Sequence, residues 1–187
     1  MNSVRGLTFI ELLISLLIIS VLIVTSIPSF QNLLKKHKSQ RVFSLTLQAI
    51  YYARAKALTT QTVVTLCPTT DELSKCGTKW EDGIQIFADI DENGKFDHKQ
   101  DTLLRSFPSG NHAYLLRWAS FGNRSYLQYT PLGHTKNQNG TFIYCPQDGD
   151  VKYANAIIIN RAGRARRGYD KNNNGIIERA NGKDIAC

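Results

Sequence analysis

The chain has 187 residues, a hydrophobic fraction of 42% and a formal net charge of +8. This length suits one domain with an appendage rather than several domains, and the apolar content allows a real core to form. The charge is concentrated in residues 1–60 and 151–168, so the sequence favours a polyanion or an anionic membrane as a partner at these two places only.

The N-terminal segment is a short polar leader followed by an apolar run from Leu7 to Ile27. As a helix this run rises about 30 Å, which is enough to cross the hydrocarbon core of a membrane. A signal peptide or signal anchor is the simple alternative, but the leader is very short and no small-x-small cleavage site follows the run. Glu11 lies inside the run, where an ionised carboxylate costs about 2.5 kcal/mol or more, so we expect it to have a positively charged partner.

The segment GLTFIE, from Gly6 to Glu11, resembles the leader of type IV pilins and type II secretion pseudopilins. The resemblance implies that a prepilin peptidase cleaves between Gly6 and Leu7 and that Leu7 becomes the methylated amino terminus. It implies that Glu11 pairs with the terminal amine of a neighbouring pilin subunit, which supplies the expected cation. It also implies a single-pass inner-membrane protein with a periplasmic globular domain, later incorporated into an extracellular pilus.

After Pro28 the helix should resume as an amphipathic stem that ends at about Thr60. Spacings of three and four residues place apolar side chains on one face of this stem. They are Phe43, Leu47, Ile50 and Ala57. We therefore expect a leader at 1–6, a transmembrane or filament-core helix at 7–28, a stem at 29–60, and a globular β-rich domain at 61–187 whose arginine-rich tail begins at about 161.

From Gln61 onward the sequence changes to short β-type runs separated by turn residues. The seven runs are residues 62–67, 83–89, 102–107, 113–118, 125–129, 141–145 and 155–160. The segment DENG at 91–94 suits a hairpin turn. Seven strands after one long helix predict an α+β domain with antiparallel sheets packed on the stem, and the resemblance implies a type IV pilin-like fold.

The four cysteines allow three disulfide pairings. Cys67 and Cys76 flank a turn-like segment, and Cys187 is the last residue, so a natural role of Cys145 is to tether that end. We therefore favour Cys67–Cys76 with Cys145–Cys187, which implies an oxidising compartment. A zinc site is the alternative, but neither a CxxC pair nor a nearby histidine supports it.

Two segments, 89–97 and 170–178, imitate the start of a calcium loop, with oxygen ligands at positions 1, 3 and 5 and glycine at position 6. The stronger set is Asp89, Asp91, Asn93 and Asp97. Position 12 is Gln100 in the first segment and Asn181 in the second, so neither segment has the bidentate glutamate. A tight turn explains the same Asp, Asn and Gly content, so we expect no resident metal or other cofactor, with calcium as the alternative.

Within the pilin superfamily, residues 87–107 and 157–168 resemble the GspH/FimT group of minor pseudopilins and minor pilins. In the FimT-like branch, a GRxR motif in the C-terminal tail is associated with DNA binding during natural transformation. The segment from Gly163 to Arg166 fits this motif residue by residue. The resemblance therefore implies DNA as a partner.

The charge of the arginine-rich segment supports the same partner. The guanidinium group is a rigid, always-charged fork that contacts phosphate oxygens in pairs, and flanking glycines let a backbone approach closely. Because no helix or β-ribbon is predicted here, binding should be largely sequence-independent. The expected DNA-binding residues are Arg161, Gly163, Arg164, Arg166, Arg167, Lys152 and Lys171. The alternative is that these arginines solubilise a tail, or pair with Asp148, Asp150 or Asp170 at a subunit contact.

Two functions therefore compete. The first is a minor type IV pilin that captures DNA for uptake in natural transformation. The second is a GspH-like pseudopilin of type II secretion, or a minor pilin that primes pilus assembly, without DNA binding. An enzyme is not expected, because the four histidines are scattered and none of the GxSxG, P-loop, GxGxxG or HExxH motifs occurs.

Overall fold

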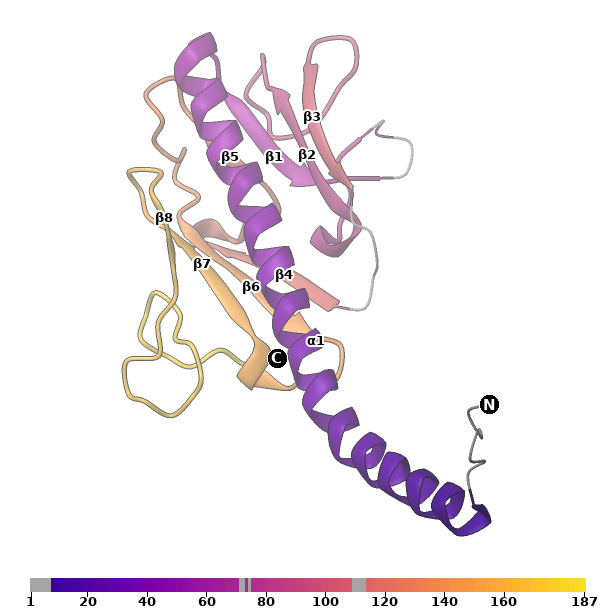
Figure 1. The fold of residues 1–187 in the computed structure, drawn as a ribbon. Coiled ribbons are helices and arrows are strands. Elements are labelled where there is room, and N and C mark those ends of the chain that lie inside the picture. Colours follow the sequence, from indigo (N-terminus) through magenta and orange to yellow (C-terminus); the bar gives the residue numbers. More distant parts are fainter. Residues whose placement is uncertain (1–7, 71–72, 74, 109–113) are drawn as a thin grey trace. The chain divides into compact units, whose positions relative to one another are not determined.

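The computed structural model describes residues 8–70, 73, 75–108 and 114–187, except for the side chains of residues 25–29 (Figure 1). The chain divides into two compact units, Met1–His37 and Lys38–Cys187. The elements of the described residues, apart from three short 3₁₀ helices, are α1 Phe9–Thr60, β1 Val64–Pro68, β2 Gly83–Ala88, β3 Thr102–Pro108, β4 Tyr114–Ser120, β5 Leu127–Tyr129, β6 Gly140–Pro146, β7 Asn155–Ile159 and β8 Ala165–Arg167.

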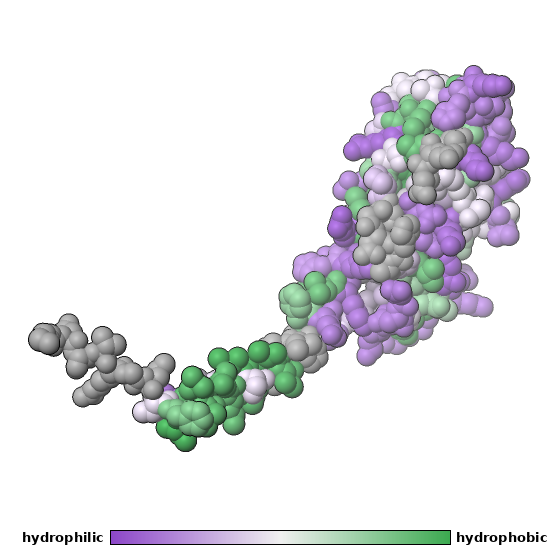
Figure 2. Space-filling model, turned by 90° about the vertical axis from the view of Figure 1, so that its right-hand side faces the viewer, coloured by the Kyte–Doolittle hydropathy of each residue, from purple (hydrophilic) through white to green (hydrophobic). Residues whose placement is uncertain are grey.

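The first unit contains the N-terminal part of α1, whose large apolar side chains between residues 9 and 24 are exposed. Figure 2 shows this part of the helix as a mainly apolar surface. Among the residues that the structure describes, no helix combines the length and the hydropathy needed to cross a membrane. The side chain of Glu11 is exposed in the first turn of α1, while the expected cleavage site, Gly6 and Leu7, lies outside the described residues.

The second unit contains α1 from Lys38 onward together with both sheets. The helix ends at Thr60, where the stem was expected to end. Its inner face is fully buried at Ile50, and alanines at positions 49, 53 and 57 form a completely buried row with four-residue spacing. These small side chains let the strands pack close to the helix, so this part of the stem belongs to the globular unit.

The strands form two antiparallel sheets with the orders β3-β2-β1-β5 and β4-β6-β7-β8. Both sheets pack on α1 (Figure 1) and share one core with it. The core side chains from the strands include Leu66, Ile86, Leu127, Tyr129, Phe142, Tyr144, Ile157 and Ile159. The expected α+β fold is confirmed, each of the seven predicted strands is present, and β8 is an eighth that the sequence analysis did not predict.

The two expected disulfides are confirmed. Cys67 pairs with Cys76 beside β1, and Cys145 of β6 pairs with Cys187 at the end of the chain. The second bridge is reinforced by Arg117 of β4, whose Nη2 donates to the carbonyl oxygen of Ala186 at 2.8 Å. The C-terminal residues are therefore fastened to the second sheet.

The expected hairpin turn at residues 91–94 is wrong, because β2 and β3 are joined by the longer loop 89–101. Glu92 and Gly94 have positive φ angles of 59° and 75° in this loop. The loop folds around the buried carboxylate of Asp89, which accepts the N–H groups of Asn93 and Gly94 at 3.1 and 3.0 Å. A side chain, rather than a two-residue turn, organises this connection.

Candidate functional site

The arginine-rich segment is a β-hairpin in which a tight turn joins β7 and β8. The N–H of Gly163 donates to the carbonyl oxygen of Asn160 at 2.9 Å, and the N–H of Asn160 donates to that of Arg164 at 3.2 Å. The side chain of Asn160 closes the same turn, since its Oδ1 accepts the N–H of Arg164 at 3.0 Å. The expectation of a tail without strand structure is therefore wrong, because β8 is an ordered edge strand beside β7 (Figure 1).

Two buried or partly buried side chains fix this turn to the body of the protein. Arg54 of α1 donates from Nε to the carbonyl oxygen of Gly133 at 2.9 Å and from Nη2 to that of Ala162 at 3.4 Å. Tyr129 of β5 donates its hydroxyl to the carbonyl oxygen of Gly163 at 3.4 Å. The Tyr129 side chain is completely buried, and burial raises the pKa of its phenol above the usual value, so the hydroxyl stays a donor at neutral pH.

Strand alternation divides the arginines between the two faces of β8. Ala165 packs into the main core, and the guanidinium carbon of Arg167 lies 4.8 Å from the ring centroid of Phe43 in α1. Because successive side chains of a strand point to opposite faces, Arg164 and Arg166 lie on the face turned away from α1. The RxR spacing therefore places the Cα atoms of Arg164 and Arg166 about 7 Å apart, with both side chains on one face of the sheet edge.

All four arginines are exposed, but their contacts differ. Arg161 donates to Oδ1 of Asn137 at 3.2 Å, and Arg166 donates to the carbonyl oxygen of Arg167 at 3.4 Å. The Arg164 side chain makes no hydrogen bond within the described residues. No salt bridge neutralises any of the four guanidinium groups in the described part of the chain. Pairing with an aspartate at a contact between subunits stays the alternative.

Arg167 is held more firmly than the other three. Besides its contact with Phe43, its Nε donates to Oδ1 of the buried Asn155 at 3.2 Å. These contacts fasten β8 to β7 and to α1. Arg167 is therefore better suited to stabilising the hairpin than to reaching a ligand, which departs from its expected role in binding.

Gly163 also departs from its expected role. The residue is buried, and a Cβ atom there would lie 2.1 Å from the carbonyl oxygen of Gly133. Its φ angle of 74° is one that other residues rarely adopt. Glycine is required because two loops of the protein meet at this position, so the expectation that Gly163 lets the backbone approach DNA is wrong.

The two expected lysines lie at the other end of the hairpin. Lys152 precedes β7 and Lys171 follows β8, and both side chains are exposed. Tyr169, also between β8 and this end, is 60% exposed. The basic groups therefore follow the hairpin from its turn to its open end, with Tyr169 as an aromatic surface beside them.

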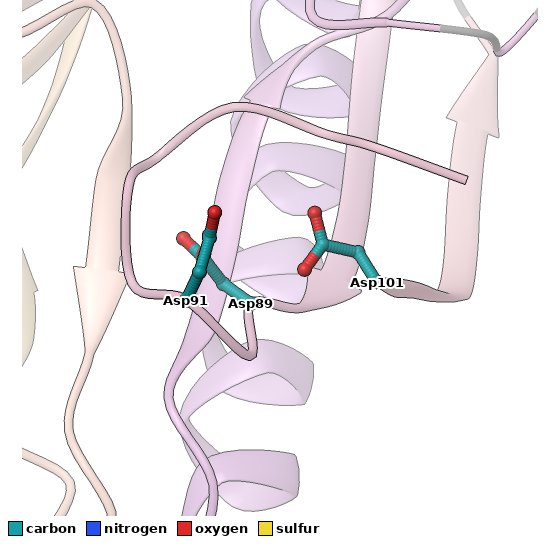
Figure 3. A group of neighbouring side chains, drawn as sticks. All are labelled: Asp89, Asp91 and Asp101. Atoms are coloured by element: carbon teal, nitrogen blue, oxygen red, sulfur yellow. The ribbon is translucent and has the colours of Figure 1, made fainter. Parts of the chain in front are cut away.

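A second cluster consists of the carboxylates of Asp89, Asp91 and Asp101, whose oxygen atoms approach within 4.8 Å of one another (Figure 3). Figure 3 shows Asp89 and Asp91 on one turn and Asp101 facing them from the segment before β3. Asp101 therefore takes the place that Asp97 was expected to fill. Asp101 was not predicted as a ligand because it stands one position after the glutamate position of a calcium loop.

Protein groups already donate hydrogen bonds to the two buried carboxylates of this cluster, those of Asp89 and Asp101. Besides two backbone N–H groups, Asp89 accepts the hydroxyl of Thr65 and the Nε2 amide of Gln128. Asp101 accepts the N–H groups of Ile90 and Asp97 at 3.0 and 2.9 Å. The cluster could supply oxygen ligands to a divalent cation, but its hydrogen bonds equally explain it as the organising centre of the loop.

Arg54 and Asn160, which position the arginine turn, were also not predicted from the sequence. A single arginine between the buried alanines at 53 and 57 was a signal for Arg54, because a charged group at the border of a buried helix face needs a partner. Asn160 directly precedes the first arginine, and asparagine side chains commonly bond to nearby backbone in turns. The carbonyl oxygens that Arg54 reaches belong to residues far away in the sequence, whereas Asn160 makes a local contact by accepting the N–H of Arg164.

Comparisons with known proteins now bear on the fold and the family. The family model described as type II transport protein GspH matches residues 45–163, and the model of the prokaryotic N-terminal methylation motif matches residues 1–27. Two crystal structures of the type IV minor pilin FimU from Pseudomonas aeruginosa PAO1 are similar to the chain. One has 17% sequence identity and a TM-score of 0.54, covering 75% of this chain and 92% of FimU. The other has 19% identity and a TM-score of 0.50, covering 65% and 86%.

No protein of curated function shows significant sequence similarity to the chain. The GspH match ends at Gly163, so Arg164, Arg166 and Arg167 lie beyond the residues that the family model covers. The comparisons therefore describe the fold and the N-terminal motif, while the role of the arginine hairpin has to be argued from its own geometry.

Proposed function

The chain belongs to the GspH family, and on this premise we propose that it is a minor subunit of a type IV pilus whose β7–β8 hairpin binds DNA for uptake in natural transformation. The family consists of pilin and pseudopilin subunits, so other pilin subunits are its partners. The observation that carries the DNA proposal is the exposed, unneutralised guanidinium pair Arg164 and Arg166 on one face of an edge strand.

The rigidity of the hairpin favours binding. Arg54 and Tyr129 fix the turn, and Arg167 fixes the strand to Phe43, so the backbone loses little further freedom when a ligand is bound. The remaining flexible parts are the exposed side chains, whose guanidinium groups match phosphate oxygens in a bidentate manner. A fixed backbone that carries flexible, positively charged side chains is suited to binding a regular polyanion such as DNA.

The affinity should come mainly from phosphate contacts. With Arg167 committed to Phe43 and Asn155, three guanidinium groups are available: Arg161, Arg164 and Arg166. Three phosphate contacts give a log–log salt slope of about −2.7, which is about a fortyfold loss of affinity between 50 and 200 mM salt. We expect little base readout, because the described residues contain no helix in or beside the hairpin that could enter a major groove and β8 is only three residues long.

A charged edge strand has a competing explanation, since arginine at a sheet edge also prevents edge-to-edge pairing with other chains. This explanation predicts no affinity for DNA. A titration of fluorescent duplex DNA with the full chain in detergent micelles, at several salt concentrations, separates the two. The variant Arg164→Gln/Arg166→Gln should weaken binding at least about tenfold at 50 mM salt and make the salt slope shallower by about 1.8.

The matched control is Lys95→Gln/Lys99→Gln, which removes the same charge from exposed side chains in the 89–101 loop. We expect it to bind DNA with the wild-type affinity and nearly the wild-type slope. An Arg164→Gln/Arg166→Gln variant that retains both the affinity and the slope of the wild type would rule out the hairpin as the DNA-binding site.

The description of the matching family model as a type II transport protein favours a second candidate, a pseudopilin of type II secretion or a minor pilin that primes assembly. In that case the arginine face contacts another subunit rather than DNA. The double variant would then leave DNA retention unaffected and reduce incorporation into the fibre or secretion instead.

The N-terminal methylation motif at residues 1–27 supports maturation by a prepilin peptidase. On this proposal the peptidase cleaves between Gly6 and Leu7, Leu7 is methylated, and Glu11 pairs with the amine of a neighbouring subunit. The subunit is then held in the inner membrane by its apolar N-terminal helix, with the globular unit in the periplasm, before it enters the pilus. The two disulfides fit that oxidising compartment.

A further inference from the structure

The loop that follows β8 places oxygen-bearing side chains at alternate positions. Asp170, Asn172 and Asn174 occupy positions 1, 3 and 5, and Gly175 follows at position 6 with a φ angle of 82°. The N–H groups of Asn174 and Gly175 donate to the two carboxylate oxygens of Asp170 at 3.2 and 2.7 Å. The N–H of Ile176 donates to Oδ1 of Asn174 at 2.8 Å. These hydrogen bonds wrap the backbone around the carboxylate of Asp170, as in the first half of a calcium loop.

Glu178 provides an independent observation at this loop. The residue is only 4% exposed, and its Oε1 accepts the N–H of Lys171, the second residue of the loop, at 3.2 Å. Its carboxylate therefore lies against the loop that Asp170 begins. The other oxygen, Oε2, is buried and has no hydrogen-bond partner, and no salt bridge reaches Glu178 within the described residues.

A buried carboxylate oxygen without a partner is costly, because it has lost its water and gained nothing in exchange. Native proteins satisfy nearly all such atoms, so an exception calls for a group that offsets it. A cation bound by the loop would do so, since position 9 of a calcium loop is itself a ligand position and Glu178 occupies position 9 counted from Asp170.

The 89–101 loop shows that the curled backbone alone does not require an ion. Its hydrogen bonds follow the same pattern, since Asp89 accepts the N–H groups of Asn93 and Gly94. There, however, Thr65 and Gln128 also donate to Asp89. In the 170–178 loop the donors to Asp170 are backbone N–H groups, and Glu178 retains an open oxygen. The two loops therefore differ in how far protein donors satisfy their carboxylates.

Neighbouring segments of the same protein hold the 170–178 loop in place. Asn174 donates from Nδ2 to a carboxylate oxygen of Asp184 at 2.7 Å, which orients its amide. The N–H of Ile185 donates to the carbonyl oxygen of Ile177 at 2.9 Å, and the buried Ile185 side chain packs beside the disulfide-bonded Cys145. A ligand set on a backbone fixed in this way loses little entropy on binding an ion.

We propose that residues 170–178 form a calcium site in which Asp170, Asn172, Asn174 and Glu178 supply side-chain oxygens and Ile176 supplies its carbonyl oxygen. Calcium is favoured over magnesium because the proposed ligands are all protein oxygens, whereas magnesium retains several waters. With two carboxylates and no bidentate glutamate at position 12, the affinity should be that of extracellular modules, with a Kd of about 10⁻⁴–10⁻³ M. This site does not depend on DNA binding by the hairpin.

The test is calorimetric titration of the full chain in detergent micelles with CaCl₂ and, separately, MgCl₂. The wild type should bind one Ca²⁺ per chain and bind Mg²⁺ at least about tenfold more weakly. Glu178→Gln keeps the shape of the side chain but removes its charge, and should raise the Kd for Ca²⁺ at least about tenfold. Asp91→Asn is the matched control, because it removes an exposed carboxylate of the Asp89, Asp91 and Asp101 cluster in the other loop, and it should leave the Kd unchanged.

Circular dichroism verifies that Glu178→Gln is folded. If it is not, Asn172→Ala, a change of an exposed ligand, takes its place with the same expected loss. The proposal is overturned if the wild type shows no Ca²⁺-dependent heat, if the ligand variant binds as tightly as the wild type, or if Asp91→Asn alone abolishes binding, which would assign the ion to the 89–101 loop.

Discussion

Arg54, near the C-terminal end of α1, donates from Nε to the carbonyl oxygen of Gly133 at 2.9 Å, a contact that joins residues 79 apart in the sequence. The second branch of the same guanidinium group reaches the carbonyl oxygen of Ala162 in the arginine turn at 3.4 Å. One side chain of the stem therefore positions both loops at the end of the hairpin that carries Arg161 and Arg164.

Replacing Arg54 should loosen this turn. We expect Arg54→Leu to lower the free energy of unfolding by about 1.5–3 kcal/mol, because two partly buried carbonyl oxygens lose a charged donor. Arg54→Lys keeps the positive charge but not the forked guanidinium group that reaches both carbonyl oxygens. It should therefore be less destabilised than Arg54→Leu but still less stable than the wild type. Urea denaturation of the full chain in micelles measures both variants, and a leucine variant as stable as the wild type would contradict the prediction.

Gly163 should tolerate no side chain. Gly163→Ala places a Cβ 2.1 Å from the carbonyl oxygen of Gly133 and also retains a φ angle of 74°. Gly149→Ala is the control, since its φ angle is 72° but nothing lies within 4 Å of its Cβ. The control should lose about 1 kcal/mol from backbone strain, and Gly163→Ala should lose about 2–3 kcal/mol more. Equal losses in urea unfolding would show that the clash is relieved at no cost.

Arg166 and Arg167 should separate binding from stability. Arg167→Gln removes the contacts with Phe43 and Asn155, so it should lower the free energy of unfolding by about 1 kcal/mol with little change in affinity for DNA. Arg166→Gln should do the reverse, weakening DNA binding while leaving stability within about 0.5 kcal/mol of the wild type. Both variants carry the same charge change, so equal effects on DNA affinity would mean that net charge alone matters.

Tyr144 should make the protein sensitive to alkaline pH. Its side chain is 2% exposed and its hydroxyl has no hydrogen-bond partner in the described residues, and burial raises its pKa to about 12 from the ordinary value of 10.0. A raised phenol pKa means that the contribution to stability is fully present below pH 10 and is lost as the pH rises toward 12.

The variant Tyr144→Phe tests this contribution. It should be as stable as the wild type or up to about 1 kcal/mol more stable at pH 7, because it removes an unsatisfied buried hydroxyl. Its unfolding free energy should fall less steeply than that of the wild type between pH 10 and 12. A parallel fall in both proteins would assign the alkaline loss to other groups, including the fully buried Tyr129.

The two disulfides should contribute unequally. In the chain-entropy treatment, closing the loop of sequence separation 42 between Cys145 and Cys187 stabilises the fold by about 4 kcal/mol, and closing the loop of separation 9 between Cys67 and Cys76 by about 2.7 kcal/mol. Replacing each pair by serine and measuring urea unfolding checks the order. A larger loss from the Cys67–Cys76 pair would show that local packing outweighs the constraint on the unfolded chain.

Much of the fold was predictable from local patterns. The long helix ending at Thr60, the seven strands and both disulfides follow from periodicity, turn residues and the places of the cysteines. The GLTFIE leader could also be recognised from the sequence. An ionised glutamate inside an apolar run costs enough free energy that a specific role for it is expected. Each of these signals lies within a few neighbouring residues, so no knowledge of distant contacts was required.

The prediction failed where a residue's role depends on a partner far away in the sequence. The cluster of arginines was visible, but strand β8 was not, because two of its three residues are arginines and the strand is ordered by pairing with β7. That pairing places Arg166 and Arg167 on opposite faces, and the loop around Gly133 requires glycine at position 163. The same holds for Glu178. No local sequence pattern predicts that this residue is buried with one carboxylate oxygen that has no hydrogen-bond partner.

The sequence by itself determined the class of protein, the helix, most strands and the presence of an unusually dense group of guanidinium charges. The tertiary structure decided which of those charges support the hairpin and which are displayed on its outer face. The physical reason is that hydrophobic periodicity and turn chemistry act over a few residues, whereas the orientation of a charged side chain is set by the groups that packing brings beside it.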